Sequence, residues 1–250
     1  SGCGASVQVQ QPTIPGERGS IHATLTTPAN AENMPAVVIC HGFTGNRQLD
    51  GHAKPLAKTL AQHGIASIAI DFAGSGESVE PFTAYTPANM RDDITSAITY
   101  LTDTVGADPE RIGLLGHSMG SFYARQYLCE WGDELDGAII MGTGFQPKAL
   151  VQLARTICRV LAVFHGWHYR SKLVARLSFL GYNKGLEGRT THDWLNRDPV
   201  EVDRYRADER CTFIFTLNAY YSMFSGILRL HDPAFLAKMP KDLPLLFLAG

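Results

Sequence analysis

A serine set between glycines, in the segment GHSMG at residues 116–120, is the feature of this sequence that points most clearly to chemistry. It follows an apolar run at Arg111–Leu115 and precedes a helical pattern at Met119–Glu130. A serine on a sharp turn from strand to helix stands clear of the sheet, and the first amides of the helix favour negative charge beside it. The spacing predicts that Ser118 is a nucleophile for acyl transfer. The alternative is a glycine-rich turn with an ordinary helix-capping serine.

A second glycine-rich loop, HGFTG at residues 41–45, follows the buried-strand pattern Ala36–Cys40. Acyl transfer needs two backbone N–H donors for the oxyanion of the tetrahedral intermediate. One usually comes from the residue after the nucleophile and the other from an earlier loop. In this sequence they would be the amides of Met119 and Phe43. The alternative is a tight turn whose glycines only relieve crowding of the backbone.

These two loops need a sheet that brings strand ends together. Short apolar runs alternate with helical patterns between about residues 20 and 143. This alternation predicts an α/β fold with a mainly parallel sheet and helices on both faces, and two N-terminal β-rich runs would form an antiparallel edge. The expected strands are Val7–Gln11, Ile21–Thr26, Ala36–Cys40, Ala66–Phe72, Arg111–Leu115 and Asp136–Met141, and the expected helices are Lys54–His63, Met90–Val105 and Met119–Glu130.

The pattern changes in the second half of the chain. Pro147 to about Lys238 is mostly helical in pattern, with Cys211–Phe215 as the one strand candidate. Pro244–Gly250 then returns to a buried-strand signature. We therefore expect an α/β core at residues 1–145, a helical cap inserted at 146–240 and a returning core strand at 241–250.

The composition argues against several partners and cofactors. Charged residues make up 18% of the chain and its net charge is −2, so nothing indicates a nucleic acid partner. No run of about 18 apolar residues occurs, so no transmembrane helix is expected. The sequence has no phosphate-binding loop or dinucleotide fingerprint, and His165 and His168 have no neighbouring carboxylate or thiol. We therefore expect no organic cofactor and no metal.

The cysteines bear on the compartment. They are Cys3, Cys40, Cys129, Cys158 and Cys211. Their odd number and wide spacing favour reduced, mostly buried thiols over a disulfide framework, and with them a cytoplasmic location. The opening Ser-Gly-Cys-Gly is similar to the processed end of a bacterial lipoprotein, so anchoring through Cys3 is the alternative.

Over nearly its whole length the sequence resembles the α/β-hydrolase superfamily of serine hydrolases. The segments IPGERG at residues 14–19 and HGFTGNR at 41–47 look like bacterial cinnamoyl (feruloyl) esterases. GHSMGS at 116–121, with the basic and aromatic cap, looks like the branch of lysophospholipases and monoacylglycerol lipases, which grades into serine aminopeptidases. The resemblance implies a Ser–His–acid triad whose acid follows the strand after the cap and whose histidine lies near the C-terminus.

The catalytic acid and histidine stay unassigned, because the resemblance puts both after Gly250, where the given sequence ends. Asp193 and His231 follow Ser118 in the right chain order, and His165, His168 and His192 also lie downstream of it, but all of these residues lie in the cap. Residues beside the two loops that are expected to support them, rather than to act as base or acid, are His41, His117 and Asp71.

The cap carries an excess of positive charge. From Pro147 to Arg197 there are nine Lys and Arg residues against Glu187 and Asp193, with apolar and aromatic residues interleaved. One interpretation is a solvated helical face. The other is a surface that attracts anionic head groups or makes peripheral contact with anionic lipid.

From these residues we expect a carboxylic ester hydrolase that forms an acyl-enzyme at Ser118, with a small-molecule or lipid ester as substrate. Monoacylglycerol or lysophospholipid-like esters and hydroxycinnamate esters both stay open, and the cap favours the former. The second hypothesis is a serine aminopeptidase with the same catalytic residues. It would need an acidic pocket for a free amino terminus, and the basic cap argues against it. A hydrolase-like binding protein without catalysis is the third hypothesis.

Overall fold

The computed structural model describes residues 6–42, 45–186 and 188–248, which separate into two compact units. One unit consists of Ser1–Phe145 with Asp232–Gly250, and the other is Gln146–His231. The second unit is therefore an insertion in the chain of the first. The sequence-based end of this insertion, residue 240, differs from the structural one because Met239 and Leu243 pack against the core of the first unit.

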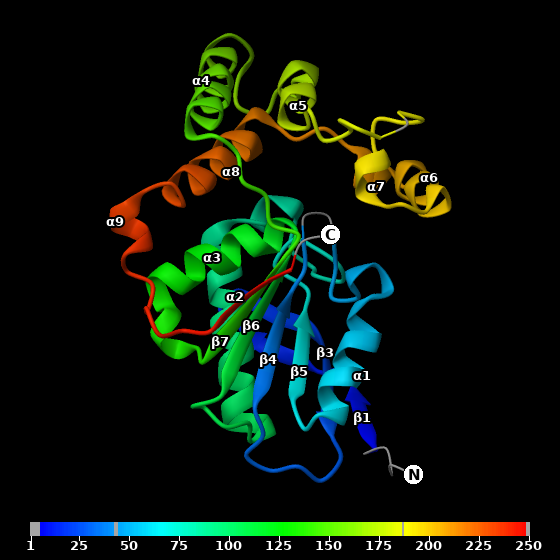
Figure 1. The fold of residues 1–250 in the computed structure, drawn as a ribbon, viewed down its shortest axis with the longest axis vertical. Helices are drawn as coiled ribbons and strands as arrows, with labels where there is room; N and C mark the ends of the chain where they lie inside the picture. The colour runs from blue at the N-terminus through cyan, green and yellow to red at the C-terminus, as the bar shows by residue number, and fades with distance from the viewer. Residues whose placement is uncertain (1–5, 43–44, 187, 249–250) are drawn as a thin grey trace. The chain divides into compact units, whose positions relative to one another are not determined.

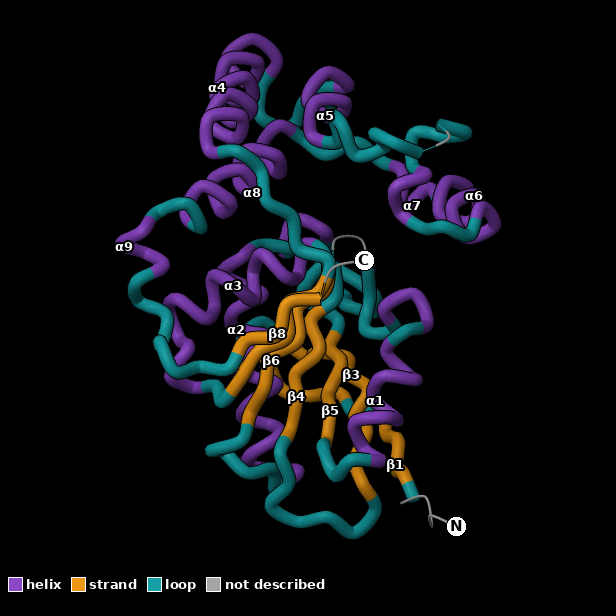
Figure 2. Tube along the Cα trace, viewed as in Figure 1, coloured by secondary structure: helices purple, strands orange, loops and turns teal. Residues whose placement is uncertain are grey.

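A mixed sheet of eight strands forms the centre of the first unit (Figure 2). The strands are β1 (Val7–Gln10), β2 (Thr13–Gly16), β3 (Gly19–Pro28), β4 (Ala36–Cys40), β5 (Ala66–Ile70), β6 (Ile112–His117), β7 (Gly137–Met141) and β8 (Leu245–Leu248). Their order is β1-β3-β5-β4-β6-β7-β8, with β2 paired to β3. From β5 to β8 all neighbours are parallel, whereas β1, β2 and β3 form antiparallel pairs. The expected α/β class and mainly parallel sheet are confirmed.

Helices lie on both faces of this sheet, with α1 on one side and α2 and α3 on the other (Figure 1). The helices of the first unit are α1 (Ala53–Gln62), α2 (Pro87–Thr99), its π-helical continuation η3 (Tyr100–Val105), α3 (Met119–Trp131) and α9 (Pro233–Leu236), with short 3-10 turns at η1 (Leu49–Gly51), η2 (Phe82–Ala84) and η4 (Gly132–Glu134). Local chemistry fixes the start of α2, because the Thr86 hydroxyl accepts from the amide of Asn89 and a proline follows Thr86.

The central parallel strands are apolar runs because side chains on both of their faces are buried. Val38 and Leu114 belong to the core under α2 and α3, whereas Ile39 and Leu115 belong to the core under α1. The register pairs Cys40 at the end of β4 with residue 116 in β6. The loops that follow β4, β5 and β6 therefore meet at one edge of the sheet, where parallel strands usually present a site.

The second unit is helical among its described residues. Its helices are α4 (Lys148–His165), α5 (Lys172–Ser178), α6 (Pro199–Ala207), α7 (Glu209–Thr212) and α8 (Leu217–Arg229), with a 3-10 turn at η5 (Asp193–Leu195). The strand expected at Cys211–Phe215 is wrong. The segment ends α7 and then forms a loop, in which the Ile214 carbonyl accepts from the Arg170 guanidinium at 2.6 Å rather than from a neighbouring strand. None of the helices described in either unit combines the length and apolarity that spanning a membrane requires.

Candidate active site

Ser118 occupies the turn between β6 and α3, and its backbone is strained there. Its φ of 53° and ψ of −123° lie in a region that few non-glycine residues adopt, at a cost of about 1–3 kcal/mol. Its amide donates to the Met141 carbonyl at 2.9 Å, and its carbonyl accepts from the Ser121 amide at 2.9 Å. These bonds hold the turn while Ser118 itself is exposed.

The glycines on either side of Ser118 leave the space that this turn requires. A Cβ atom on Gly116 would lie 2.7 Å from the Cβ of Ala124 and 2.7 Å from the carbonyl oxygen of Gly120. A Cβ on Gly120 would lie 2.5 Å from the carbonyl oxygen of His41. Larger residues at these positions would push α3 away from β6 and from the loop after β4.

The loop after β4 passes directly against the serine. A Cβ on Gly42 would lie 2.9 Å from the Cβ of Ser118 and 3.4 Å from its Oγ. Any larger residue would therefore displace the hydroxyl or the loop. Gly42 is a site residue that was not predicted individually, although its place in the HGFTG segment was the available signal.

The carbonyl oxygen of Gly42 accepts three hydrogen bonds. The donors are the Gly45 amide at 3.1 Å, the Tyr85 hydroxyl at 3.2 Å and Nδ1 of His41 at 2.6 Å. The amide of Phe72 lies 3.2 Å from Nε2 of His41, and because an amide N–H can only donate, the proton of this neutral ring is on Nδ1. Burial raises the pKa of the Tyr85 hydroxyl well above its ordinary value, which keeps it protonated as a donor.

Backbone amides beside Ser118 could hold an oxyanion. Met119 is the first residue of α3, so its amide has no acceptor within the helix, and the helix dipole adds partial positive charge there. The second expected donor, the amide of Phe43, lies outside the described residues and stays a prediction.

Asp71 holds the loop after β5. Its carboxylate accepts from the amide of Arg47 at 2.7 Å and from the amide of Glu77 at 3.0 Å. The Arg47 guanidinium also forms ion pairs with the carboxylates of Asp71 and Glu77. Gly76 has a φ of 54°, and the Asp71 carboxylate occupies the space where its Cβ would be. With these partners, Asp71 supports the loop.

The remaining acid and base candidates lie in the second unit, and most of them have local partners. The His165 ring stacks on Tyr169 with centroids 4.4 Å apart. Asp193 accepts from the Thr190 hydroxyl and, at 2.9 Å, from the Thr190 amide, and these bonds lower the pKa of its carboxyl. His231, His192 and His168 belong to the same unit, whereas His117 directly precedes Ser118. The acid and base therefore stay unassigned.

The cysteines and the other potential metal ligands do not form a metal site among the described residues. Cys40, Cys129 and Cys158 are buried and Cys211 is half-buried, while Cys3 lies outside the described residues. Within residues 6–42, 45–186 and 188–248, no three His, Cys, Asp or Glu side chains gather as metal ligands do.

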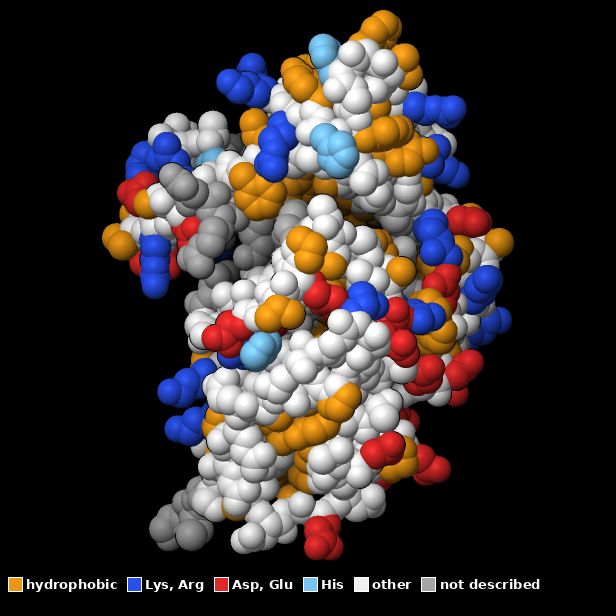
Figure 3. Space-filling model, turned by 180° about the vertical axis from the view of Figure 1, so that it is seen from behind, with side chains coloured by type: hydrophobic (Ala, Val, Ile, Leu, Met, Phe, Trp, Pro, Cys, Tyr) orange, Lys and Arg blue, Asp and Glu red, His pale blue; other side chains and the backbone are white. Residues whose placement is uncertain are grey.

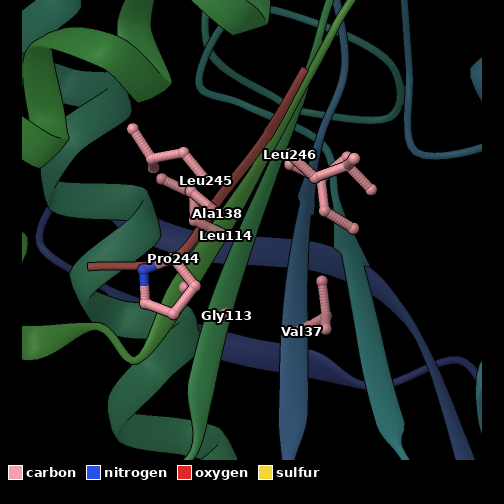
Figure 4. A pocket seen from close by; sticks show the side chains of 9 residues that line it. Val37, Gly113, Leu114, Ala138, Pro244, Leu245 and Leu246 are labelled. Carbon is pink, nitrogen blue, oxygen red and sulfur yellow. The ribbon is translucent and has the colours of Figure 1, made fainter. Parts of the chain in front are cut away.

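One face of the sheet carries an open cavity of about 330 Å³ that is lined by strands and by Pro244, the residue before β8 (Figure 4). Its lining comes from β4, β6, β7 and β8 and includes Val37, Ile139 and Leu246. Leu246 and Phe247 point to opposite faces of β8, yet they are 52% and 57% exposed. The sheet therefore presents apolar surface on both sides of β8, which parallel sheets normally cover.

Comparison with known proteins supports this fold. Residues 31–250 match the hydrolase family described as serine aminopeptidase S33. A carboxyl esterase from Bacillus coagulans, solved in complex with glycerol, superposes with a TM-score of 0.76 at 18% sequence identity, over 96% of this chain and 78% of that chain. At this identity the likeness shows a shared fold.

Two curated relatives match shorter stretches. An uncharacterized 31.7 kDa protein of Escherichia coli, from the traX-finO intergenic region, is 33% identical over 100 residues, which are 40% of this chain and 34% of that protein. The thiohydrolase aneE of Aspergillus aculeatus is 29% identical over 131 residues, which are 52% of this chain and 35% of that protein. The chain thus spans about a third of the length of the curated relatives it matches. The family match covers residues 31–250, which is most of the chain. The chain therefore belongs to the serine aminopeptidase S33 family of hydrolases, with an α/β-hydrolase fold.

Proposed function

We propose that this hydrolase cleaves a carboxylic ester through an acyl-enzyme on Ser118. The observation that carries the proposal is the exposed serine on a strained turn at the start of α3, with Gly42 directly against it. An ordinary capping serine has an extended backbone, and its side chain accepts from an amide of the first helical turn. Ser118 has a positive φ and makes no such side-chain bond, so capping does not explain it.

In the proposed reaction, Oγ of Ser118 attacks the ester carbonyl carbon while a base takes its proton. Negative charge moves to the carbonyl oxygen, toward which the amide of Met119, and by prediction that of Phe43, would donate. The C–O bond to the alcohol then breaks, and the base returns the proton to the leaving alcohol. Water then attacks the acyl-enzyme by the same steps, which releases the carboxylic acid product and regenerates the Ser118 hydroxyl.

We expect the base and the acid of this reaction in chain that follows Gly250. The support is the open apolar surface beside β8, which a further strand and helix would cover, and their loops would reach the edge of the sheet that holds Ser118. His41 is a poor candidate for the base because its Nε2 already accepts from the amide of Phe72.

As substrate we propose an ester of an apolar acyl chain, such as a monoacylglycerol or a lysophospholipid-like ester, ahead of a hydroxycinnamate ester. The support is the inserted unit, which is rich in basic and aromatic residues. Steady-state kinetics on matched esters of these classes test the choice. A higher kcat/KM for the acyl glycerol supports it, and a higher kcat/KM for methyl ferulate contradicts it.

A serine aminopeptidase is the second candidate, because the family that the chain matches carries that description. It would use the same nucleophile on a peptide, so mutation of Ser118 alone does not separate the two. An amino-acid anilide with a free amino group and an ester of the same acyl group do separate them. Faster cleavage of the anilide would favour the peptidase.

The test of the nucleophile compares Ser118→Ala with Ser222→Ala, an exposed serine on α8. The first variant should lower kcat/KM for the ester by about 10⁴-fold or more, since the acyl-enzyme cannot form. The second should retain full activity. Equal loss in both, or none in either, would contradict the proposed role of Ser118.

A further inference from the structure

The outward side of α4 is apolar, which is unusual for a helix on a protein surface. Its inward side packs against α8 and consists of Val151, Cys158 and Ala162. The outward side carries Ala149, Leu153, Val160 and Phe164, which recur at helical spacing and are all exposed. Phe164 is 77% exposed and Leu153 58% exposed. A helix that is apolar on both sides calls for something to cover the second side.

Aromatic side chains continue this surface beyond the end of α4. Trp167 and Tyr169, in the turn before α5, are 41% and 42% exposed. Trp167 packs edge-on against Tyr221 of α8, with ring centroids 5.2 Å apart, so the ring is held in place with part of its surface uncovered. Trp and Tyr are enriched where an apolar phase meets water, because their rings are apolar with one polar group.

Positive charge surrounds the same surface. No Asp or Glu occurs from Gly137 to Leu186, whereas seven basic residues lie between Pro147 and Leu186. They are Lys148, Arg155, Arg159, Arg170, Lys172, Arg176 and Lys184. Among the described residues, none of these seven forms an ion pair, whereas Arg189, Arg204 and Arg206 of the same unit do. Hydrophobic side chains (orange) and Lys and Arg side chains (blue) lie side by side in the upper part of Figure 3, on the surface of α4 and α5.

The basic residues of α4 are ordered relative to its apolar side. Lys148, Arg155 and Arg159 are seven and four residues apart, so they form one stripe along the helix. Around the helix this stripe lies between the buried side and the ridge of Leu153, Val160 and Phe164, and Gln152, Thr156 and Val163 separate it from the ridge. An apolar ridge with a basic flank and aromatic rings at one end is the side-chain distribution of a helix that lies in a membrane interface.

We propose that this surface, here named the α4 face and made of the exposed side of α4, the turn with Trp167 and Tyr169, and the flanking basic residues, docks on an anionic lipid surface. Lipid supplies both chemistries that the α4 face lacks, an apolar phase and negative head groups, with about a fivefold gain in binding per basic residue near the surface. A symmetric dimer through the same face would instead bring like charges together. The inference does not rest on the proposed catalysis.

The test is co-sedimentation of the chain with vesicles of equal parts phosphatidylcholine and phosphatidylglycerol, and with vesicles of phosphatidylcholine alone. We expect binding to the anionic vesicles that weakens as salt is raised. The double variant Val160→Ser and Phe164→Ser should weaken this binding about tenfold, because it removes two exposed apolar side chains from the interface. The double variant Arg159→Glu and Arg176→Glu should weaken binding to anionic vesicles about tenfold or more.

Matched controls come from α6 of the same unit. Val200→Ser removes a side chain that is 69% exposed, and Arg204→Glu reverses a basic residue away from α4. Both should bind vesicles as the wild type does. The proposal is overturned if the wild type binds neither vesicle, or if the α4 variants and the α6 controls behave alike. It is also overturned if the α4 variants abolish self-association in solution and leave vesicle binding unchanged, since a second copy would then cover this surface.

Discussion

Gly42 and Ser118 are in such close contact that a Cβ atom on Gly42 would lie 2.9 Å from the Cβ of Ser118. The loop after β4 and the turn after β6 therefore touch through a residue that can only be glycine without rearrangement. This contact fixes where the Ser118 hydroxyl stands relative to the Gly42 loop.

Gly42→Ala should lower kcat/KM for ester hydrolysis about 10²-fold, since displacing a reacting group by about 1 Å costs that much. Gly113→Ala in β6 is the matched control, because its Cβ would meet Val37 at an ordinary 3.4 Å. Steady-state kinetics on both variants check the prediction. Equal activities would show that the contact with Ser118 has no part in catalysis.

Tyr85→Phe removes one of the three donors to the Gly42 carbonyl and leaves the other two. We expect a several-fold lower kcat with KM nearly unchanged, because the loop is less well held while the substrate-binding groups remain. The control is Tyr127→Phe, which also loses a buried hydroxyl bond, to Glu134 at 2.6 Å. That control should lower stability by about 1 kcal/mol without changing kcat. An identical split between kcat and KM in both variants would contradict a positioning role for Tyr85.

Ser118→Gly should fold more stably than Ser118→Ala by about 1 kcal/mol, although both lose activity. Alanine keeps the cost of the positive φ at this turn, whereas glycine adopts it freely. Urea unfolding of the two variants measures the difference. A more stable alanine variant would mean that the turn stores no strain.

Asp93 on α2 makes the stability of the fold depend on pH. Its buried carboxylate accepts from the Ala73 amide at 2.9 Å and pairs with Arg18 at 2.8 Å, yet burial raises its pKa to about 6. The unfolded chain, with a pKa near 4, loses this proton first as the pH rises. Between pH 4 and 6 the folded chain therefore binds more protons, and its free energy of unfolding falls with rising pH, by about 3 kcal/mol in total.

Asp93→Asn should remove this slope, so the difference in unfolding free energy between wild type and variant should change by about 3 kcal/mol between pH 4 and 7. The free energy of unfolding of the wild type should rise relative to that of the variant as the pH is lowered. Asp92→Asn, which removes the neighbouring contact to Arg18 at 3.2 Å, should keep the wild-type slope. Parallel profiles for wild type and Asp93→Asn would refute the assignment.

Much of the fold could be predicted because burial on both faces leaves a plain signal. Ala36–Cys40 was expected as a strand and is β4, since an unbroken apolar run has few other stable states. The strand β2 (Thr13–Gly16) was missed, although Ile14 is fully buried between exposed neighbours, because Pro15 and Gly16 are untypical of strands. Edge position makes both tolerable there.

Local sequence patterns predict only part of the candidate site. The turn at Ser118 could be anticipated because glycine spacing reports backbone crowding directly. The bond from Tyr85 to Gly42 joins residues 43 positions apart, and no periodicity or motif links them. The strand expected at Cys211–Phe215 was wrong for a related reason, since a distant guanidinium, that of Arg170, takes the Ile214 carbonyl that a strand would have used.

The most direct test of the central claim is the intact mass of the polypeptide, as its gene encodes it, before and after reaction with a fluorophosphonate. We predict one adduct on the wild type and on Ser222→Ala, and none on Ser118→Ala. A folded wild type that takes no adduct, or a Ser118→Ala protein that still takes one, would contradict an activated nucleophile at Ser118.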